Sequence, residues 1–260
     1  MLDLSNTINF ISGKKKTITK KKKKMNQNNR NIKICNQLIK LNPNDYEAYY
    51  RRGVAKSDLG NDQGALEDFN KVIELQPSTE MAYYYRAISK TELGYYQEAI
   101  EDYNTAEIMD PELTDLYYNR GVAKIGLKDH PGAIVDNTKA IAINPKYAKA
   151  WYNRGLSKIK LKDYQGAIED NQKAIALDPE YAEAYTNSGY AKLNMDDLQG
   201  AMDDFNRSIA VRPLFANPYC GRGVVKLALG EFYSGCLDLE KAGDLGMKKA
   251  YDILRDYEEE

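Results

Sequence analysis

The sequence is poor in the residues that most often carry chemistry. Among 260 residues it has one histidine and three cysteines, and it contains no P-loop, GxSxG, HExxH or EF-hand pattern. His130 precedes Pro131 in a place where equivalent segments have tyrosine, which is typical of a surface residue in a turn. Without a nucleophile–base pair or a set of metal ligands, the sequence predicts no catalytic, cofactor-binding or metal-binding residues. We therefore expect a protein that is not an enzyme.

Long hydrophobic runs and paired cysteines are also lacking. No stretch approaches the ~20 apolar residues that a membrane helix needs, and the charge near the start follows the apolar part, unlike in a secretory signal. Cys35, Cys220 and Cys236 form neither a CxxC motif nor an even framework, so structural disulfides are not expected. These absences favour a cytoplasmic location and exclude membrane partners.

Charge is unevenly distributed along the chain. The net charge is −1, yet residues 1–31 hold eight lysines and Arg30 against only Asp3, a net charge of +8, which leaves −9 for the rest. We interpret residues 1–31 as a basic, low-complexity, disordered tail. The alternative is a patch that binds nucleic acid or another anionic surface, although the tract at 14–24 lacks the aromatic side chains on which bases stack.

A 34-residue repeat dominates the remainder. YYNRGVAK at 117–124 recurs as WYNRGLSK at 151–158, and prolines recur every 34 residues from Pro77 to Pro213. Such a period is the signature of stacked helical units. The six repeats are 46–79, 80–113, 114–147, 148–181, 182–215 and 216–246.

Each repeat has the pattern of two helices. The first carries an aromatic residue and, four residues later, a small one on the same face, as at Trp151 and Gly155. The second carries small or aliphatic residues seven apart, as at Ala167 and Ala174, and a proline such as Pro179 ends the unit. Short turns between helices of this length predict antiparallel hairpins.

This pattern resembles the tetratricopeptide repeat family over residues 46–246. The resemblance implies an all-α fold, a right-handed α-α superhelical solenoid of antiparallel helix hairpins. Two departures resemble the variant written NRG: an arginine precedes the small residue where the family has leucine, and a lysine follows it by three where the family has an aromatic residue, as at Arg154 and Lys158.

The arginine has a partner of opposite charge in the second helix. An aspartate follows it by sixteen residues, which predicts an ion pair linking the two helices of a hairpin. The pairs are Arg52–Asp68, Arg86–Asp102, Arg120–Asp136, Arg154–Asp170 and Arg222–Asp238. The fifth repeat has Ser188 opposite Asp204, so we expect it to be the softest hairpin.

The two ends of the array are predicted to be covered. Residues 32–45 match only the second helix of a repeat and are interpreted as an orphan capping helix. Residues 247–260 have apolar residues at i, i+3, i+4 and i+7, which predicts an amphipathic capping helix of the kind solenoids need.

In the tetratricopeptide repeat family the first helices line a concave groove that binds partners, so the resemblance implies which residues face it. Asparagine recurs at one place in three repeats and resembles the asparagine ladder in the repeat domain of O-linked N-acetylglucosamine transferase. Its side chain both donates and accepts, which suits a peptide backbone. The candidate peptide-binding residues are Asn119, Asn153, Asn187, Tyr84, Tyr85, Tyr118, Tyr152, Arg51 and Tyr190.

These observations favour a protein–protein interaction scaffold that binds an extended peptide or partner in the groove. The chaperone-binding mode of the family needs lysines and asparagines that this chain lacks at the matching places. Two alternatives stay open: binding of nucleic acid or an anionic surface through the lysine tract, and a regulatory subunit of an enzyme complex. The sequence identifies neither the partner nor the oligomeric state.

Overall fold

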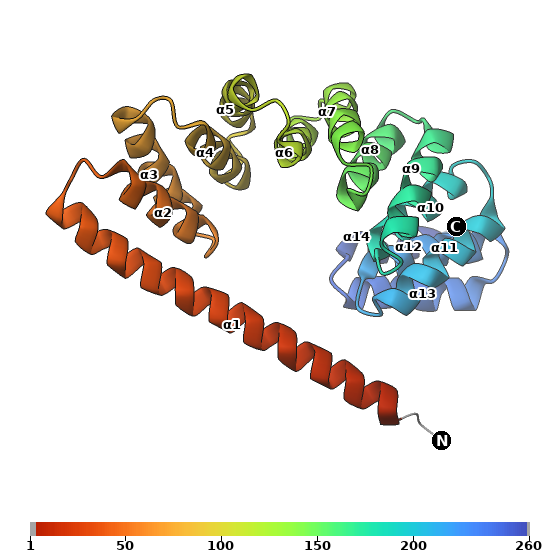
Figure 1. The fold of residues 1–260 in the computed structure, drawn as a ribbon. Helices are drawn as coiled ribbons and strands as arrows, with labels where there is room; N and C mark the ends of the chain where they lie inside the picture. Colours follow the sequence, from red (N-terminus) through yellow and green to blue (C-terminus); the bar gives the residue numbers. More distant parts are fainter. Residues whose placement is uncertain (1–3, 259–260) are drawn as a thin grey trace. The chain divides into compact units, whose positions relative to one another are not determined.

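The computed structural model describes residues 4–258, with side chains for residues 22–256, and contains fourteen helices and no strand over that range (Figure 1). An all-α solenoid of helix hairpins, as predicted, is therefore confirmed. The chain divides into an N-terminal unit, Met1–Glu112, and a C-terminal unit, Leu113–Glu260. No helix within residues 4–258 combines the length and apolarity needed to cross a bilayer.

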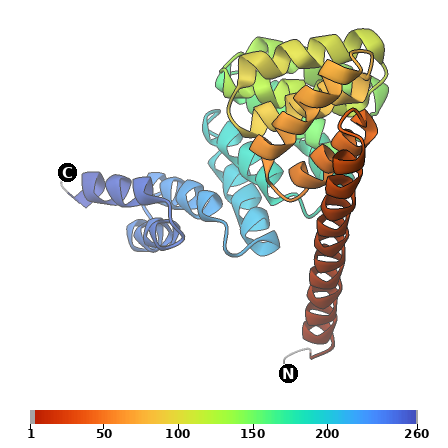
Figure 2. The ribbon, with the colours of Figure 1, turned by 90° about the vertical axis from the view of Figure 1, so that its left-hand side faces the viewer.

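The N-terminal unit contains one long helix and the first two repeats. The long helix α1 covers Leu4–Leu41 and projects past the first hairpin (Figure 2). It is followed by α2 (Tyr46–Ser57), α3 (Asp62–Leu75), α4 (Glu80–Glu92) and α5 (Tyr96–Met109).

The C-terminal unit contains the other four repeats and one further helix. The first helices of these repeats begin at the predicted residues 114, 148, 182 and 216. The helices are α6 (Thr114–Gly126), α7 (His130–Ile143), α8 (Ala148–Lys160), α9 (Tyr164–Leu177), α10 (Ala182–Leu193), α11 (Leu198–Val211), α12 (Ala216–Ala228), α13 (Phe232–Asp244) and α14 (Lys248–Glu258).

Small residues allow the helices of each hairpin to approach closely. The alanines of the second helices, from Ala65 to Ala201, are fully buried. A Cβ built at Gly223 would lie 3.0 Å from the Gly235 carbonyl oxygen, so no larger residue fits at this crossing without a shift. At the far end, Ala250 of α14 is buried in a cluster with Leu239 and Ala242, as expected for a cap.

The structure contains all five predicted arginine–aspartate pairs. In each, the arginine Nη2 lies 2.6–2.7 Å from the aspartate Oδ1, and Nε donates to Oδ2. The sequence reasoning missed a third member, the lysine four residues after the arginine, whose Nζ lies 2.7–2.8 Å from the same Oδ2. One buried carboxylate thus holds two cations of the facing helix.

The fourth repeat illustrates how far this ion group extends. Arg154 lies with its guanidinium 4.8 Å from the Trp151 ring and donates through Nη1 to Thr138 of the preceding repeat. Lys158 also donates to the Gly166 carbonyl. The group therefore ties α8 to both α9 and α7. In the fifth repeat, Asp204 keeps its lysine, Lys192, at 2.7 Å, but Ser188 is buried with an unpartnered hydroxyl.

The predicted boundary at residue 32 between a disordered tail and a capping helix is wrong. Helix α1 continues through it, and Asn28 is buried with its Nδ2 3.2 Å from Asp58 Oδ2. Lys24 Nζ lies 2.9 Å from the other oxygen of Asp58, which follows α2. An acidic residue at the end of the first hairpin helix therefore anchors the basic stretch, a tertiary contact that local composition could not show.

The turn between the two helices of each hairpin contains one residue in the left-handed backbone conformation. It is glycine in the first, second and sixth repeats, but Lys128, Lys162 and Asp196 adopt φ of 60–64° in the other three. A residue with a Cβ is destabilised in this conformation by roughly 1–2 kcal/mol relative to glycine. The three central turns are therefore more strained than the outer ones.

We predict that Arg154→Leu lowers the free energy of unfolding by about 3 kcal/mol, because Asp170 keeps only Lys158 as a counterion. Asp170→Asn in the same chain is expected to recover part of this loss. Chemical denaturation of the two single variants and the double variant measures the coupling. Arg207→Leu, at an exposed arginine on α11, is the matched control. Simple additivity of Arg154→Leu and Asp170→Asn would show that the pair does not act as a unit.

We also predict that Lys162→Gly raises the free energy of unfolding by up to about 1 kcal/mol, because relief of the left-handed strain exceeds the added entropy of the unfolded chain. Lys173→Gly, at an exposed residue inside α9, should instead lower it by about 0.5–1 kcal/mol. Thermal unfolding of both variants tests this. A loss of stability in Lys162→Gly would contradict the assignment of strain to this turn.

Candidate functional site

Six of the nine predicted peptide-binding residues lie in the C-terminal unit, on three neighbouring helices. Helix α8 contacts both α6 and α10. Asn119 and Tyr118 are on α6, Asn153 and Tyr152 on α8, and Asn187 and Tyr190 on α10. The same place in successive repeats therefore forms one row across the unit.

Tyrosine pairs flank the asparagine row. Tyr118 packs on Tyr147 with ring centroids 5.1 Å apart, and Tyr152 packs on Tyr181 at 4.9 Å. Burial raises the pKa of both Tyr152 and Tyr181, and neighbouring tyrosines together with Glu183 add to the effect at Tyr181. The hydroxyls therefore stay protonated and can donate hydrogen bonds. Tyr147 and Tyr181 precede first helices, and the sequence reasoning missed them because it considered only helical places.

Tyr147 and Tyr181 also line a cavity of about 490 Å³. Lys149, Glu183 and Arg212 line it as well. Arg212 donates to both carboxylate oxygens of Glu183 at 2.6 and 3.0 Å, and this pair bridges the fifth repeat's first helix and the end of its second. The cavity offers both charges beside aromatic rings, so it suits a polar side chain better than an aliphatic one.

Tyr190 lies in the same unit but is engaged in packing. Its ring lies edge-on to Phe205 with centroids 5.1 Å apart, and its hydroxyl donates to the Asn217 carbonyl at 2.9 Å. Burial raises its pKa. The structure therefore uses the Tyr190 hydroxyl to join α10 to α12.

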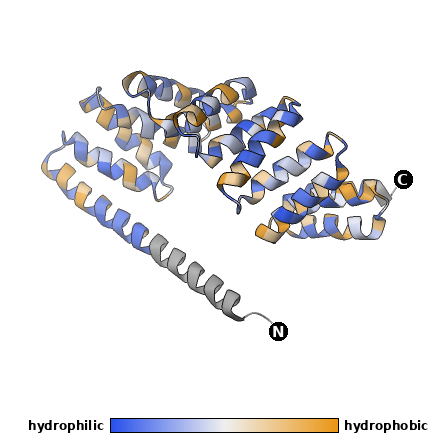
Figure 3. Cartoon of the chain, turned by 45° about the vertical axis from the view of Figure 1, so that its right-hand side comes forward, coloured by the Kyte–Doolittle hydropathy of each residue, from blue (hydrophilic) through white to orange (hydrophobic). Residues whose placement is uncertain are grey.

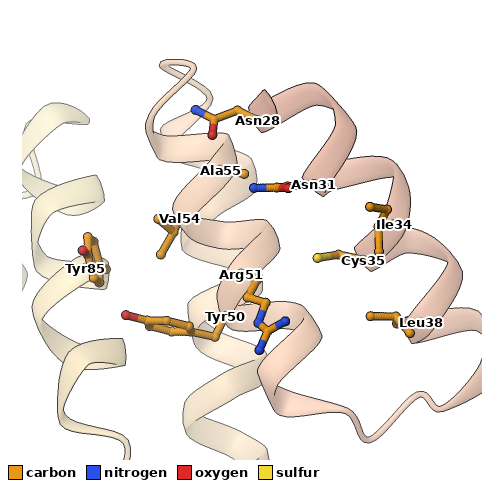
Figure 4. A pocket seen from close by; sticks show the side chains of 10 residues that line it. All are labelled: Asn28, Asn31, Ile34, Cys35, Leu38, Tyr50, Arg51, Val54, Ala55 and Tyr85. Atoms are coloured by element: carbon orange, nitrogen blue, oxygen red, sulfur yellow. The ribbon is translucent and has the colours of Figure 1, made fainter. Parts of the chain in front are cut away.

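The remaining three predicted residues belong to the N-terminal unit. Arg51 of α2 and Tyr85 of α4 line a cavity beside α1 (Figure 4). Tyr84 is only 7% exposed and packs against Tyr85 and Tyr103 with centroids 5.2 and 6.2 Å apart. As it stands, Tyr84 is part of the core and offers little surface to a ligand.

A second asparagine row lies behind the first. Asn137 of α7 and Asn171 of α9 are fully buried, and each donates through Nδ2 to the carbonyl four residues earlier, at 2.8 Å. Their Oδ1 atoms have no hydrogen-bond partner among the described residues. The Nδ2 atoms of Asn153 and Asn187 are buried and equally unpartnered.

The repeat spacing predicts that these two rows face each other. In the first repeat the corresponding place is Phe69, whose ring stacks on Tyr85 at 5.9 Å, sixteen residues later. In the fifth it is Phe205, which would collide with a Cβ at Gly221, again sixteen residues later. By the same spacing, we expect Asn137 to face Asn153 and Asn171 to face Asn187. Each facing pair therefore combines an unpartnered acceptor with an unpartnered donor.

The first asparagine row is only partly accessible to a ligand. Asn153 is only 6% exposed, so it is less accessible than a residue that simply projects into a groove. The Asn187 amide lies near the Tyr152 hydroxyl and partly opposes the rise in the pKa of that tyrosine, although it makes no hydrogen bond of good geometry there. A ligand backbone would reach these amides from the tyrosine side. Among residues 22–256 no group of three acidic, histidine or cysteine side chains is placed to hold a metal ion.

Comparisons with known proteins agree with the fold. Patterns described as tetratricopeptide repeats match residues 46–79 and 148–181, and a second pattern of the same description matches 182–213. No curated protein matches the chain in sequence.

Solved structures give the same result. A tetratricopeptide repeat protein from Parabacteroides merdae is 24% identical, with a TM-score of 0.66, over 86% of this chain and 90% of that one. PilW, a type IV pilus biogenesis factor, is 18% identical, with a TM-score of 0.70, over 80% and 98%. YrrB, described as having an unusual peptide-binding site, is 22% identical, with a TM-score of 0.59, over 69% and 92%. At these identities the likeness shows the fold alone.

We predict that the facing amides of Asn137 and Asn153 pair in solution, directly or through one water, because a buried unpartnered polar group costs about 1–3 kcal/mol. Asn137→Leu, Asn153→Ala and the double variant should then show a coupling of about 1 kcal/mol in a double-mutant cycle of unfolding. Leu239 occupies the same place in the sixth repeat, so leucine is compatible with the backbone. Two independent losses that add would show that the amides do not interact.

Proposed function

The chain belongs to the tetratricopeptide repeat family, and on that premise we propose that it is a non-catalytic interaction scaffold that binds an extended segment of a partner protein along α6, α8 and α10. The segment lies over Asn119, Asn153 and Asn187, between the tyrosine pairs of the C-terminal unit.

One observation carries the proposal. The two asparagine rows bury amides at places where other repeats of the same chain make an apolar contact. Phe69 with Tyr85, and Phe205 with Gly221, solve the same packing problem without buried amides. Unpartnered polar atoms in a core are costly and concentrate where function requires them. Among the described residues, the asparagines with such atoms are Asn137, Asn153, Asn171 and Asn187, all within the C-terminal unit.

The chemistry of these buried amides suits a peptide backbone. Pairing with Asn137 or Asn171 would fix the orientation of the front amides and leave their oxygens to accept from peptide N–H groups. Tyr118, Tyr147, Tyr152 and Tyr181 supply contact area with few rotamers to freeze. Tetratricopeptide repeat proteins include YrrB, whose description names a peptide-binding site, and this supports the class of ligand.

Magnitudes require side-chain contacts as well. Three asparagines at ~1 kcal/mol net each give about 3 kcal/mol, whereas micromolar affinity needs about 8 kcal/mol. The cavity lined by Lys149, Glu183 and Arg212 is suited to supply the difference by taking a polar side chain of the partner. Specificity would then come from this cavity, and backbone affinity from the amides.

We predict that replacing Asn119, Asn153 and Asn187 together by alanine weakens partner binding by about 2–4 kcal/mol, through loss of hydrogen bonds to a desolvated backbone. Because Asn153 is buried, each replacement should also cost about 1 kcal/mol of stability, which leaves the fold intact. A partner captured by the full chain is titrated calorimetrically against wild type and variant.

The control replaces Asn26 and Asn29, which are exposed on α1, by alanine and should leave the affinity unchanged. Unchanged affinity in the folded triple variant would refute binding along the asparagine row. It would leave the N-terminal unit or the second helices as the binding surface.

A further inference from the structure

The N-terminal unit has a cavity of about 390 Å³ that none of its own side chains fills. Helices α1 and α2 bound it on two sides, and Tyr85 points into it from α4 (Figure 4). The C-terminal unit contributes nothing to it, so it is separate from the peptide site proposed above.

One wall of the cavity is a rigid aromatic cluster. Tyr50 lies edge-on to Phe69 and to Tyr85, with centroids 6.2 and 5.9 Å apart, while Phe69 and Tyr85 stack. Burial raises the pKa of Tyr50 to about 12, so its hydroxyl remains a donor near neutral pH. Side chains held in this way lose little entropy when a ligand binds.

The opposite wall, on α1, is apolar at Ile34, Cys35 and Leu38, polar at Asn28 and Asn31, and partly open to solvent. Ile34 and Leu38 of α1 are 44% and 38% exposed, although they belong to the face of α1 that covers the hairpin. Cys35 between them is buried, and Val54 and Ala55 of α2 also line the cavity. Figure 3 shows this hydrophobic end of α1 directly after its hydrophilic stretch. A ligand side chain placed here would cover apolar surface that is otherwise exposed to solvent.

The neighbouring part of α1 is positively charged, although Lys24 is already paired with Asp58. Residues 22–41 of α1 contain six basic residues and no acidic one: Lys22, Lys23, Lys24, Arg30, Lys33 and Lys40. At the rim, Arg51 pairs with Glu47 at 2.9 Å, but both side chains are exposed, by 63% and 49%. An exposed pair of this kind contributes little to stability, so a carboxylate of a ligand can compete for Arg51.

From this combination we propose that the cavity takes an aromatic or aliphatic side chain from an acidic segment of a partner protein. The apolar anchor lies between Leu38, Val54 and Tyr85, and a flanking carboxylate contacts Arg51, whereas the basic residues of α1 add only long-range attraction. Apolar burial supplies the affinity, and the charges select against basic segments and speed association.

The test uses the full chain and a dye-labelled peptide with one central tryptophan flanked by glutamates. Fluorescence anisotropy should show binding that weakens at least tenfold when alanine replaces the tryptophan or lysines replace the glutamates. In the protein, Arg51→Glu and Leu38→Glu should each weaken binding by about tenfold or more. Thermal unfolding checks that both variants remain folded.

Matched controls separate the cavity from general charge attraction. Arg30→Glu changes the net charge as Arg51→Glu does, and Leu41→Glu, at an 85% exposed leucine, matches Leu38→Glu; neither residue lines the cavity. Both controls should change the affinity by less than about threefold. Equal losses in the controls, or equal binding of the alanine peptide, would overturn the proposal. So would an RNA oligonucleotide that binds more tightly than the peptide and loses the same affinity in Leu38→Glu.

Discussion

The structure depends on one buried ion group that recurs in the hairpins. An aspartate of the second helix, with a side chain 1–9% exposed in five repeats, holds an arginine and a lysine of the first helix. Buried ion pairs add little net stability compared with apolar packing, but they penalise every register in which a charge is left alone. We interpret the group as the device that fixes how each hairpin closes. The arginine extends this control to the preceding helix, as Arg154 does through Thr138.

Fixing the hairpins by charge leaves the other face of the first helices available for different chemistry. The same seven-residue stretch of α8 that carries Arg154 and Lys158 also carries Tyr152 and Asn153. In the N-terminal unit the corresponding face ends in an aromatic cluster and a cavity, whereas in the C-terminal unit it carries a row of amides, with a second row on α7 and α9. One repeat thus presents two kinds of surface, which accounts for the two distinct ligand classes proposed.

Much of this could be predicted from the sequence, because the 34-residue period averages out local ambiguity. The first helices begin at the predicted residues, and the arginine–aspartate pairs follow from spacing alone. Spacing within one repeat cannot show contacts between residues of different repeats or between a repeat and an end segment. Asp58 binding Lys24 and Asn28, and Tyr147 packing on Tyr118, each join one repeat or end segment to the next. The arginine–aspartate pair of the ion group was predicted, but its lysine was not, because the lysine was treated only as a departure from the family pattern.

If the ion group fixes how the hairpins close, the fifth repeat should be less stable than its neighbours without any mutation. It has Asp204 and Lys192 but Ser188 in place of arginine, while its core retains the fully buried Phe205. Native-state hydrogen exchange, resolved by peptide or residue, compares α10–α11 with α8–α9. We predict that α10 and α11 open at a free energy lower by about 1–3 kcal/mol than α8 and α9. Equal or greater protection of α10 and α11 would contradict the central role of the ion group.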